Sequence, residues 1–505
     1  MTVDYSLYLV TDSTMIPESS TFLKQVEAAI NNGATIVQLR EKNLSTLDFI
    51  TRAKQVHELT KSKGIPLIIN DRVDIALAID AEGVHVGQDD MPAELVRKLI
   101  GNDKILGVTC SIPEEAEEVV KQGFADYVGL GTVYQTNTKK NVTDPEGTGP
   151  IGIRKMLRVL QKYNKNQTKK INSVAIGGIN HSNADKVMYE CAVEGERIDG
   201  VAVVSCIMAS EDAGRATKDL LNIIKTPPKW ARKSSISVSA EKIREHVCAS
   251  HPLVHHITNN VVKNFSANVT LAIGASPIMS ELAEEFHEFA SGMDTIALVL
   301  NLGTPTSQLM SVFKTAIQEY NKFGKPIVFD PVACGATKAR LDASRKLLNS
   351  GHMSVIKGNV GEIQGIWKLT SSYSETTSGD DSLMRGVDSI AELSEDKIIQ
   401  IGKEVSTDFK TVVVITGKVN YIIEGEDKLA ICEGGSKLMG LVTGSGCSLG
   451  SILAAFLAAR YVDTFTAVVE ATKLYNEAGK KAAANSSTPG SFMISFVDEL
   501  YKLTH

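Results

Sequence analysis

The sequence lacks the features of a membrane protein or a nucleic-acid-binding protein. Its 505 residues contain no apolar run close to the roughly 20 residues that a membrane-spanning helix needs. The net charge is −6, so no basic excess favours a nucleic-acid surface. The first residues show no basic-then-apolar pattern of a secretory signal peptide. We therefore expect a cytoplasmic protein that acts on small molecules, with neither nucleic acid nor a membrane as its partner.

Cysteine is scarce as well, and its spacing excludes the usual cysteine-based sites. The seven cysteines form no C-x-x-C pair, and an odd number does not suit a disulfide framework. We expect reduced thiols. The adjacent His255 and His256 have two interpretations, a metal site or packing within the fold, and packing is favoured because neighbouring residues point in different directions on a regular element.

A stretch rich in proline, basic residues and serine, "KTPPKWARKSSISVSAEK" at 225–242, divides the chain. It has neither helical nor alternating periodicity, which is typical of a linker. We predict a first domain at 1–226, a linker at 227–238 and a second domain at 239–505.

Eight short β-branched runs alternate with amphipathic helical patterns in the first domain. Eight such units in about 220 residues predict a TIM (β/α)8 barrel, with a doubly wound open sheet as the alternative. The predicted strands are 7–12, 35–40, 66–71, 83–88, 104–109, 126–131, 173–178 and 199–205.

Charged residues follow several of these strands, on the rim where such barrels carry their active sites. Arg40 and Lys42 would share one face and suit a phosphate. Asp71 and Asp90 end neighbouring strands, and two converging carboxylates suit a Mg²⁺ ion that also takes oxygens from a diphosphate. The alternative for the two aspartates is a pair of salt-bridged rim acids.

Three later loops predict further phosphate contacts. Residues 134–140, "YQTNTKK", offer two hydroxyls and an ammonium group, which predicts a phosphate clamp or, alternatively, an ordinary polar surface loop. The loops at 176–179 and 203–206 follow the seventh and eighth strands, where barrels of this type commonly hold phosphate.

The ordered motifs "VQLREK", "IINDR", "GVHVGQDD", "QTNTKK", "AIGGI" and "VAVVS" make residues 5–225 resemble the thiamine phosphate synthase family. The resemblance implies that Asp71 and Asp90 hold Mg²⁺. It implies that the pyrimidine diphosphate is bound by Gln38, Arg40, Glu41, Lys42, Asn70, Thr109 and Lys139. It implies that the thiazole phosphate is bound by Thr136, Thr138, Gly178, Val204 and Ser205. Thr109 departs from the serine expected there, and its added methyl group puts the exact pose in doubt.

The reaction implied by this resemblance joins hydroxymethylpyrimidine diphosphate to hydroxyethylthiazole phosphate. Diphosphate leaves first, the aminopyrimidine stabilises the resulting cation, and the thiazole nitrogen attacks it. Catalysis is then electrostatic, so no nucleophilic side chain of the protein is required.

The second domain has fewer predicted strands, at 295–303, 326–331, 354–359 and 411–417, followed by a hairpin. This pattern predicts an open, mostly parallel sheet with its ligand beyond the carboxyl ends of the strands. The domain contains no GxxxxGK[ST] motif and no GxGxxG after a strand, which argues against a P-loop NTPase and a dinucleotide-binding protein.

The stretch "GLVTGSGCSLG" at 440–450 has the pattern of a glycine-rich turn at a helix start, where backbone N–H groups can receive an anion. With the long block at 254–280 and the motifs "VFDPVACGAT", "VIKGNVGEI", "MRGVDS" and "VITG", residues 240–500 resemble the hydroxyethylthiazole kinase family, whose fold is ribokinase-like. The resemblance implies that Met279 and Thr443 contact the thiazole alcohol. It implies ATP contacts at Lys357 and Thr416, Mg²⁺ ligands at Asp330 and Glu362, and an active-site role for Cys447. Lys357 stands where arginine is expected, which loses the bidentate fork.

Four roles for Cys447 can be compared. Metal ligation lacks partner residues at ligand spacing, and a covalent phosphocysteine is unnecessary. An inert buried thiol stays possible, but the place after two glycines at a helix start favours a proton acceptor. A helix N-terminus lowers a thiol pKa, whereas neighbouring phosphates raise it, so the sequence leaves the sum open.

The two domains complement each other, since the kinase would make the thiazole phosphate that the barrel consumes. We predict a bifunctional enzyme of thiamine biosynthesis and salvage, with ATP as co-substrate and Mg²⁺ as cofactor. The alternatives are a kinase of another small alcohol fused to a barrel enzyme, and a non-catalytic thiamine sensor. The resemblance further implies a homo-oligomer, because the synthase family is often dimeric and the kinase family trimeric, and a hexamer would satisfy both.

Overall fold

The computed structural model describes residues 3–136, 138, 144–231, 242–373 and 393–505. The chain folds as two compact units, Met1–Pro227 and Pro228–His505, and each is described here by itself. The predicted linker at 227–238 lies mostly outside the described residues. Of that segment, Pro228–Ala231 belongs to the second unit, where the Trp230 ring stacks on His352 with centroids 4.0 Å apart.

The first unit is a closed barrel of eight parallel strands, which confirms the barrel prediction and shows that the open sheet was wrong. Each predicted strand is present, and chain neighbours pair in register around the ring. The barrel strands are β1 (Leu7–Val10), β2 (Ile36–Leu39), β3 (Leu67–Asn70), β4 (Gly83–Val86), β5 (Ile105–Cys110), β6 (Tyr127–Gly131), β7 (Asn172–Ile176) and β10 (Gly200–Val203).

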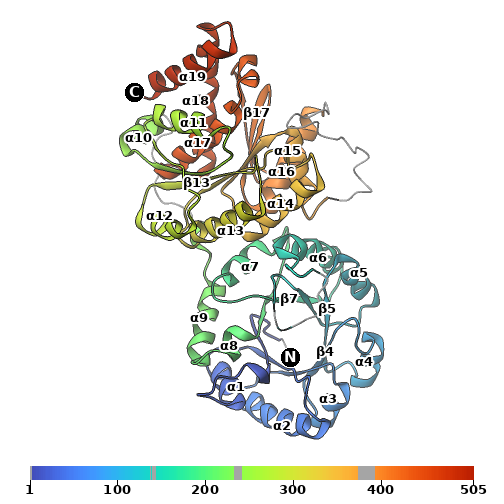
Figure 1. Cartoon of the computed structure of the whole chain (residues 1–505). Helices are drawn as coiled ribbons and strands as arrows, with labels where there is room; N and C mark the ends of the chain where they lie inside the picture. The colour runs from blue at the N-terminus through green and yellow to red at the C-terminus, as the bar shows by residue number, and fades with distance from the viewer. Residues whose placement is uncertain (1–2, 137, 139–143, 232–241, 374–392) are drawn as a thin grey trace. The chain divides into compact units, whose positions relative to one another are not determined.

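Helices surround the barrel as an outer ring (Figure 1). They are α1 (Phe22–Asn31), α2 (Thr46–Ser62), α3 (Val73–Ile79), α4 (Ala93–Ile100), α5 (Pro113–Gln122), α6 (Gly149–Asn164), α7 (Ala184–Glu190), α8 (Ser205–Met208) and α9 (Ala213–Lys225). The sequence did not predict α8 or the hairpin of β8 (Ala192–Val193) and β9 (Glu196–Arg197), because segments of two to four residues carry no periodicity.

Side chains alternate between the two faces of each strand, which separates two apolar layers. One layer, with Leu39, Ile69 and Val84, packs between the strands and the helices. The other is small and fills the inside of the barrel with Tyr8, Tyr127 and a few β-branched residues. Polar strand residues of this inner face are therefore directed into the barrel or onto its rim.

Four hydrogen bonds at the amino ends of the strands repeat once per two strands. In each, the acceptor is the side chain of the residue that directly precedes β2, β4, β6 or β10. The donor is the backbone N–H of the first or second residue of the preceding barrel strand, and the bond gives this N–H a partner. The pairs are Leu7 N to Thr35 Oγ1 (3.1 Å), Leu67 N to Glu82 Oε2 (2.9 Å), Leu106 N to Asp126 Oδ2 (2.8 Å) and Ser173 N to Asp199 Oδ2 (2.7 Å). The repeat fixes strand register at the face opposite the predicted active site.

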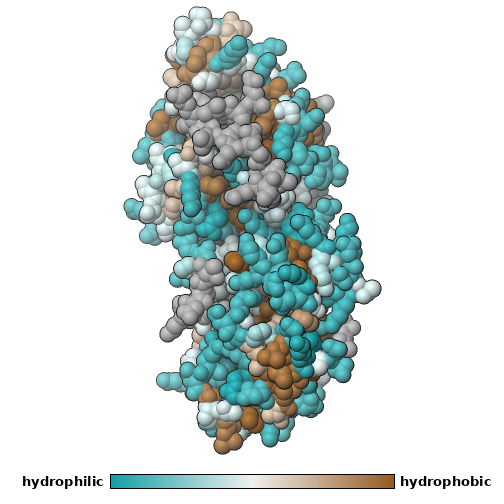
Figure 2. Space-filling view, turned by 90° about the vertical axis from the view of Figure 1, so that its right-hand side faces the viewer, coloured by the Kyte–Doolittle hydropathy of each residue, from teal (hydrophilic) through white to brown (hydrophobic). Residues whose placement is uncertain are grey.

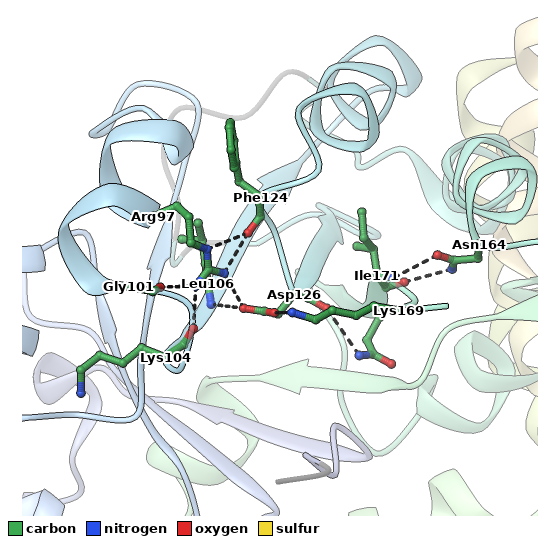
Figure 3. A network of polar contacts seen from close by, with 10 residues as sticks. Arg97, Gly101, Lys104, Leu106, Phe124, Asp126, Asn164, Lys169 and Ile171 are labelled. Carbon is green, nitrogen blue, oxygen red and sulfur yellow. Dashed lines mark hydrogen bonds and ion pairs between the residues drawn. The ribbon is translucent and has the colours of Figure 1, made fainter. Parts of the chain in front are cut away.

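Arg97 of α4 extends one of these bonds into a network (Figure 3). Its guanidinium group donates to Asp126 Oδ2 at 2.6 Å and to the carbonyl oxygen of Phe124 at 2.8 Å. It also reaches the carbonyl oxygens of Gly101 and Lys104, both at 2.8 Å. Arg97 and Asp126 are only 11% and 15% exposed, so this ion pair ties α4 to the starts of β5 and β6 in a poorly solvated place.

We expect Arg97→Ala to lower the free energy of unfolding of the barrel by about 2 kcal/mol, because it removes the buried cation of Asp126 and leaves this carboxylate only the exposed Lys169. The chain has two tryptophans, Trp230 and Trp367, and both belong to the second unit. The substitution should therefore shift the far-UV circular dichroism transition and leave the tryptophan fluorescence transition in place. Lys98→Ala is the matched control, since its pair with Glu94 is 68% and 56% exposed and contributes at most about 1 kcal/mol. Equal effects of the two substitutions would contradict the assignment.

The second unit contains one eight-stranded sheet in the order β12-β11-β13-β14-β15-β16-β17-β18. The five pairings from β12 to β16 are parallel, and the two pairings that β17 makes, with β16 and with β18, are antiparallel. This confirms the predicted mostly parallel sheet. The strands are β11 (Leu253–Ile257), β12 (Ser276–Ile278), β13 (Ile296–Asn301), β14 (Ile327–Asp330), β15 (Val355–Asn359), β16 (Val412–Thr416), β17 (Val419–Glu424) and β18 (Lys428–Glu433). The sequence missed β11, which contains two histidines, and β12, a three-residue edge strand with a central proline.

Ten α-helices of this unit lie within the described residues, on both faces of the sheet (Figure 1). They are α10 (Ile243–Ser250), α11 (Lys263–Ala272), α12 (Phe286–Gly292), α13 (Ser307–Lys322), α14 (Lys338–Ser350), α15 (Val360–Trp367), α16 (Glu395–Phe409), α17 (Ser445–Ala459), α18 (Thr464–Ala484) and α19 (Pro489–Thr504). Helix α17 is buried along almost its whole length and packs against β11, β13 and β14. Its first turn consequently lies at the carboxyl edge of the sheet.

The two adjacent histidines of β11 are packed within the core. His255 contacts the Tyr320 hydroxyl at 2.9 Å and the Ser280 carbonyl oxygen at 2.8 Å, and His256 Nε2 lies 2.9 Å from Ser451 Oγ. Burial lowers the pKa of His255 to about 4. Burial, and then the neighbouring His255, lower the pKa of His256 to about 3. Both rings are therefore neutral in the folded chain, which favours packing over a metal site.

This burial predicts acid sensitivity of the second unit. Below about pH 6.5 the unfolded chain protonates both histidines while the folded chain does not, so stability falls as the pH falls. The free energy of unfolding should lose up to about 2.7 kcal/mol per pH unit between pH 6 and pH 5 from these two groups. His256→Asn should roughly halve that slope, measured by urea unfolding with tryptophan fluorescence. A slope unchanged by the substitution would contradict the prediction.

On the face that Figure 2 shows, the coloured surface is mostly hydrophilic, with apolar patches between polar regions. On the barrel the exposed apolar side chains include Leu77 of α3 and Leu95 and Leu99 of α4. None of the described helices is both long enough and apolar enough to cross a lipid bilayer.

Candidate active sites

A continuous chain of hydrogen bonds crosses the barrel interior below the rim. Gln38 Nε2 donates to the Tyr8 hydroxyl at 3.0 Å, and this hydroxyl lies 2.7 Å from that of Tyr127. His85 bridges the Tyr127 hydroxyl and Thr109 Oγ1, both at 2.9 Å. The chain connects Gln38 of β2 with Thr109 of β5 across the barrel. The two predicted site residues therefore stand at its ends, with their orientation fixed.

Sequence reasoning did not single out Tyr8, His85 or Tyr127. Each lies within an apolar strand pattern, and only barrel closure brings β1, β2, β4 and β6 around a common interior. The available signal was the polar His85 at an inward position of "GVHVG", two residues before the rim.

Arg40 and Lys42 follow β2 and both lie at the rim. The Arg40 backbone N–H donates to Thr11 Oγ1 at 3.0 Å, and its guanidinium group approaches the Thr138 carbonyl oxygen at 3.4 Å. Arg40 therefore lies beside the loop after β6, which contains two of the predicted phosphate-binding threonines. The Lys42 ammonium group forms an ion pair with Asp71.

Asp71 and Asp90 converge, as the magnesium prediction requires. Burial raises the pKa of Asp71 and the neighbouring Asp90 carboxylate raises it further, against the opposing effect of Lys42. Burial also acts on Asp90, but hydrogen bonds from Asp71 and from the Gly87 N–H, the latter at 2.8 Å, lower its pKa overall. Each carboxylate affects the pKa of the other, so the two side chains lie close together. Such a donor set fits Mg²⁺, which binds to one or two carboxylates and completes its shell with substrate phosphate oxygens.

Glu41 has a different environment from its neighbours. One carboxylate oxygen accepts from Arg52 at 2.7 Å and the other from Ser13 Oγ at 2.7 Å. Its side chain is 3% exposed. These contacts favour a supporting role, in which Glu41 holds the backbone between Arg40 and Lys42, over direct contact with an anionic ligand.

The loops after β6 and β7 lie against each other. The Tyr134 N–H donates to the Gly177 carbonyl oxygen at 3.0 Å, and Asn183 Nδ2 to that of Gly178 at 3.0 Å. Gly178 has φ +67, and a Cβ there would lie 2.6 Å from the Gln135 carbonyl oxygen, so only glycine fits.

The other predicted thiazole phosphate residues lie on this part of the rim or beside it. Thr136 accepts from the Thr138 N–H at 3.2 Å within the loop after β6. Val204 and the exposed Ser205 follow β10, which pairs with β7. Asn70 ends β3 and is 9% exposed. Lys139 lies outside the described residues.

In the second unit, the predicted kinase residues meet at the first turn of α17. Lys357 of β15 donates to Asp330 Oδ2 and to the Gly446 carbonyl oxygen, both at 2.9 Å. Burial disfavours its charged form, but Asp330 and then Cys447 and Glu362 outweigh this effect and raise the Lys357 pKa. Lys357 therefore stays charged although it is almost completely buried.

Glu362 lies at the start of α15 behind this ion pair. Its carboxylate accepts from the Ala333 N–H at 2.9 Å and from the Asn359 N–H at 2.8 Å, and the latter bond forms part of a capping box. Burial, and then the charge of Asp330, raise the pKa of Glu362 to about 7. Two acidic side chains in electrostatic contact, with a surplus of negative charge, fit an oxygen-preferring cation such as Mg²⁺.

Cys447 lies in the same cluster, with its sulfur 3.3 Å from Asn301 Nδ2. Burial, and then Asp330, raise the pKa of the thiol to about 12, although Lys357 acts in the opposite direction. Burial is thus the main cause of the high thiol pKa, and sequence reasoning did not consider it. The cluster also identifies Asn301 as a functional candidate whose partners sequence reasoning missed.

The remaining predicted kinase residues lie on other segments of the second unit. Met279 directly follows β12 and is partly buried, and Thr443 is exposed in the turn before α17. Thr416 ends β16 in register with Asn359. The motif "MRGVDS" at 384–389 lies outside the described residues. Within the described part of the chain, no group of three or more His, Cys, Asp or Glu side chains forms a metal site by itself.

The barrel rim carries basic groups that suit phosphate. The ribokinase-like sheet carries acidic side chains at the carboxyl ends of its strands. Together they define the class of the protein as a two-domain transferase of phosphorylated small molecules. Comparisons with known proteins agree with this class. A sequence model of the Thiamine monophosphate synthase family matches residues 7–207, and one of the Hydroxyethylthiazole kinase family matches residues 244–505.

Full-length relatives contain both units in one chain. The "Thiamine biosynthetic bifunctional enzyme" of Saccharomyces cerevisiae is 40% identical over 537 residues, which cover 100% of this chain and 96% of the relative. The "Probable thiamine biosynthetic bifunctional enzyme" of Schizosaccharomyces pombe is 41% identical over 516 residues, with 99% and 95% covered. The chain belongs to this family of bifunctional thiamine biosynthetic enzymes.

The environment of Cys447 predicts a thiol that reacts slowly. With a pKa of about 12 it holds little thiolate at pH 8, so iodoacetamide should modify it at least about 100-fold more slowly than an ordinary thiol of pKa near 8.5. Mass spectrometry of the peptide that contains Cys447 gives the rate, and the same peptide in guanidinium-unfolded protein is the control. Labelling of the folded protein as fast as of the unfolded protein would show that the helix N-terminus outweighs burial.

Proposed function

We propose that the chain catalyses two consecutive steps that end in thiamine phosphate. The second unit transfers a phosphoryl group from ATP to 4-methyl-5-(2-hydroxyethyl)thiazole. The barrel joins this product to 4-amino-2-methyl-5-hydroxymethylpyrimidine diphosphate and releases diphosphate. One observation carries the proposal: each unit has an ion pair between a lysine and an aspartate at the carboxyl ends of its parallel strands. The pairs are Lys42 with Asp71 and Lys357 with Asp330.

In the barrel, the protein's task is to stabilise charge on the leaving diphosphate. Arg40 and Lys42 lie where the diphosphate oxygens would develop negative charge, and Lys139 is assigned to the same group by the family resemblance. Mg²⁺ held by Asp71 and Asp90 would supply further charge neutralisation. Gln38 and Thr109, at the ends of the inner hydrogen-bond chain, would orient the pyrimidine so that the thiazole nitrogen attacks the cation.

The thiazole phosphate would lie on the neighbouring part of the rim. Thr136 and Thr138 supply hydroxyl groups, and Gly178 allows close approach of the backbone. Val204 and Ser205 begin the short helix after β10, where backbone N–H groups are free of helical partners. Sites after the seventh and eighth strands agree with the general position of phosphate in such barrels.

In the kinase unit, Lys357 and Thr416 would contact ATP, and Met279 and Thr443 the thiazole alcohol. Mg²⁺ held by Asp330 and Glu362 would shield the phosphate oxygens. Cys447 would accept the proton of the substrate hydroxyl as a thiolate, after its own proton has passed to solvent. Mg²⁺ at Asp330 would neutralise its charge and so lower the pKa of the thiol, because the Asp330 charge is one cause of the high value.

We further propose domains at 1–226 and 239–505, a cytoplasmic location and a homo-oligomer, with a hexamer compatible with both families. The exposed leucines of α3 and α4 support an oligomer, since they leave apolar surface open on the barrel.

Separate loss of the two reactions tests the proposal. The coupled assay supplies pyrimidine diphosphate, hydroxyethylthiazole, ATP and Mg²⁺ and measures thiamine phosphate. Asp90→Asn should lower the barrel reaction about 100-fold, because it removes a carboxylate of the metal pair, and leave thiazole phosphorylation within about 2-fold. Cys447→Ala should lower phosphorylation at least about 10-fold and leave the barrel reaction unchanged when thiazole phosphate is supplied.

Cys447→Asp distinguishes a proton acceptor from an inert thiol. A carboxylate at the same position should retain phosphorylation, whereas the alanine variant should not. A parent rate in Cys447→Ala would contradict the base role. Failure of the parent chain to phosphorylate hydroxyethylthiazole would contradict the substrate assignment of the second unit.

A further inference from the structure

Asn301 is the residue through which the predicted kinase side chains contact one another. It ends β13, is 2% exposed, and uses both atoms of its side-chain amide. Its Nδ2 donates to Asp330 Oδ2 at 2.9 Å and to Cys447 Sγ at 3.3 Å. A single NH₂ group therefore sets the spacing between the predicted proton acceptor and a predicted magnesium ligand.

The orientation of this amide is fixed from its other side. Asn301 Oδ1 accepts from Asn259 Nδ2 at 2.8 Å and from the Gly303 N–H at 3.0 Å. Because a backbone N–H can only donate, the oxygen must face Gly303 and the NH₂ group must face Cys447 and Asp330. Both acceptor and both donor positions of the amide are in use, so a rotation would break four bonds.

The backbone around the amide is braced as well. A Cβ at Gly303 would lie 2.6 Å from Asn259 Nδ2, so the close approach needs glycine. Arg340 of α14 donates at 2.9 Å to the carbonyl oxygens of Leu302, Gly303 and Val332. These residues belong to the loops that follow β13 and β14. One guanidinium group thus joins the segments that carry Asn301 and Asp330.

We propose that Asn301 is a positioning residue of the kinase reaction, which holds the Cys447 sulfur at a fixed place beside Asp330. The inference rests on the proposed role of Cys447. Phosphoryl transfer depends mainly on positioning and charge neutralisation, and a displacement of about 1 Å can cost about 100-fold in rate. Loss of the amide should therefore act on kcat more than on substrate binding.

The test compares Asn301→Ala with Asn321→Ala in the full chain. Asn321 also makes two side-chain hydrogen bonds, with the N–H and the carbonyl oxygen of His352. It lies in the last turn of α13, before β14 begins and away from the carboxyl edge of the sheet. Asn301→Ala should lower kcat for thiazole phosphorylation about 100-fold with both KM values within about 3-fold. Asn321→Ala should keep kcat within about 2-fold. The barrel reaction of the same protein, expected within about 2-fold in both variants, reports that the chain is intact.

A double-mutant cycle with Cys447→Ala shows whether Asn301 acts through the sulfur. In the Cys447→Ala background the further change Asn301→Ala should cost less than about 3-fold. A cost of about 100-fold in that background, a KM effect in place of a kcat effect, or an unchanged kcat in the single variant would each overturn the inference. If Cys447→Ala alone keeps the parent rate, the proposed role of the thiol fails, and this inference fails with it. An impaired Cys447→Ala beside an unimpaired Asn301→Ala refutes only the present inference.

Asn259→Ala provides a second variant that leaves Asn301, Cys447 and Asp330 in place. It removes one of the two donors that orient the amide. We expect a decrease in kcat of about 10-fold in the same direction. If Asn301→Ala does not fold, judged by tryptophan fluorescence, this variant decides the question, and an unchanged kcat would overturn the inference.

Discussion

Parallel strands bring all their carboxyl ends to one edge, and both sites depend on that constraint. In the barrel the edge closes into a ring, so side chains from β2, β3, β4, β5 and β6 meet across one opening. In the second unit the edge is open, and the first turn of α17 supplies the missing side. Polar groups at these edges are separated by tens of residues in the chain, yet they lie within hydrogen-bond distance of one another.

In each site a lysine forms an ion pair with an aspartate, but the two pairs differ in how far they are exposed to water. Lys42 is 50% exposed beside Asp71, so water screens the pair and the ammonium group can leave it easily. Lys357 and Asp330 are 5% and 2% exposed, and each would be very costly to bury alone. The barrel pair is thus only weakly held, whereas the kinase pair is a fixed part of its fold. At such a buried position the single point charge of lysine also fits the two acceptors, Asp330 and the Gly446 carbonyl oxygen, that lie on either side of it.

Much of the fold and much of the site composition could be predicted from the sequence. Strand runs ending in polar residues located the barrel strands and the rim, and the GSGC turn located the start of α17. The strands β11 and β12 were not predicted, because histidine and proline interrupt the usual strand pattern. Asn301 was visible as a strand end, but its contacts with Asp330 and Cys447 depend on strand order and on the packing of α17. The pKa of Cys447 could not be predicted either, because desolvation depends on neighbours from β13, β14 and β15.

The high pKa of Cys447 constrains how this thiol can take part in phosphoryl transfer. A group that holds its proton at neutral pH must release that proton to solvent before it can take the substrate proton. In a loose transition state the bond to the incoming oxygen forms late, so the hydroxyl becomes acidic only after most of the leaving-group bond has broken. Where the sulfur lies at that moment then matters more than its basicity in the free protein. The hydrogen bond from the Asn301 amide and the buried ion pair of Lys357 and Asp330 hold the sulfur in one place, as the proposed role of this thiol requires.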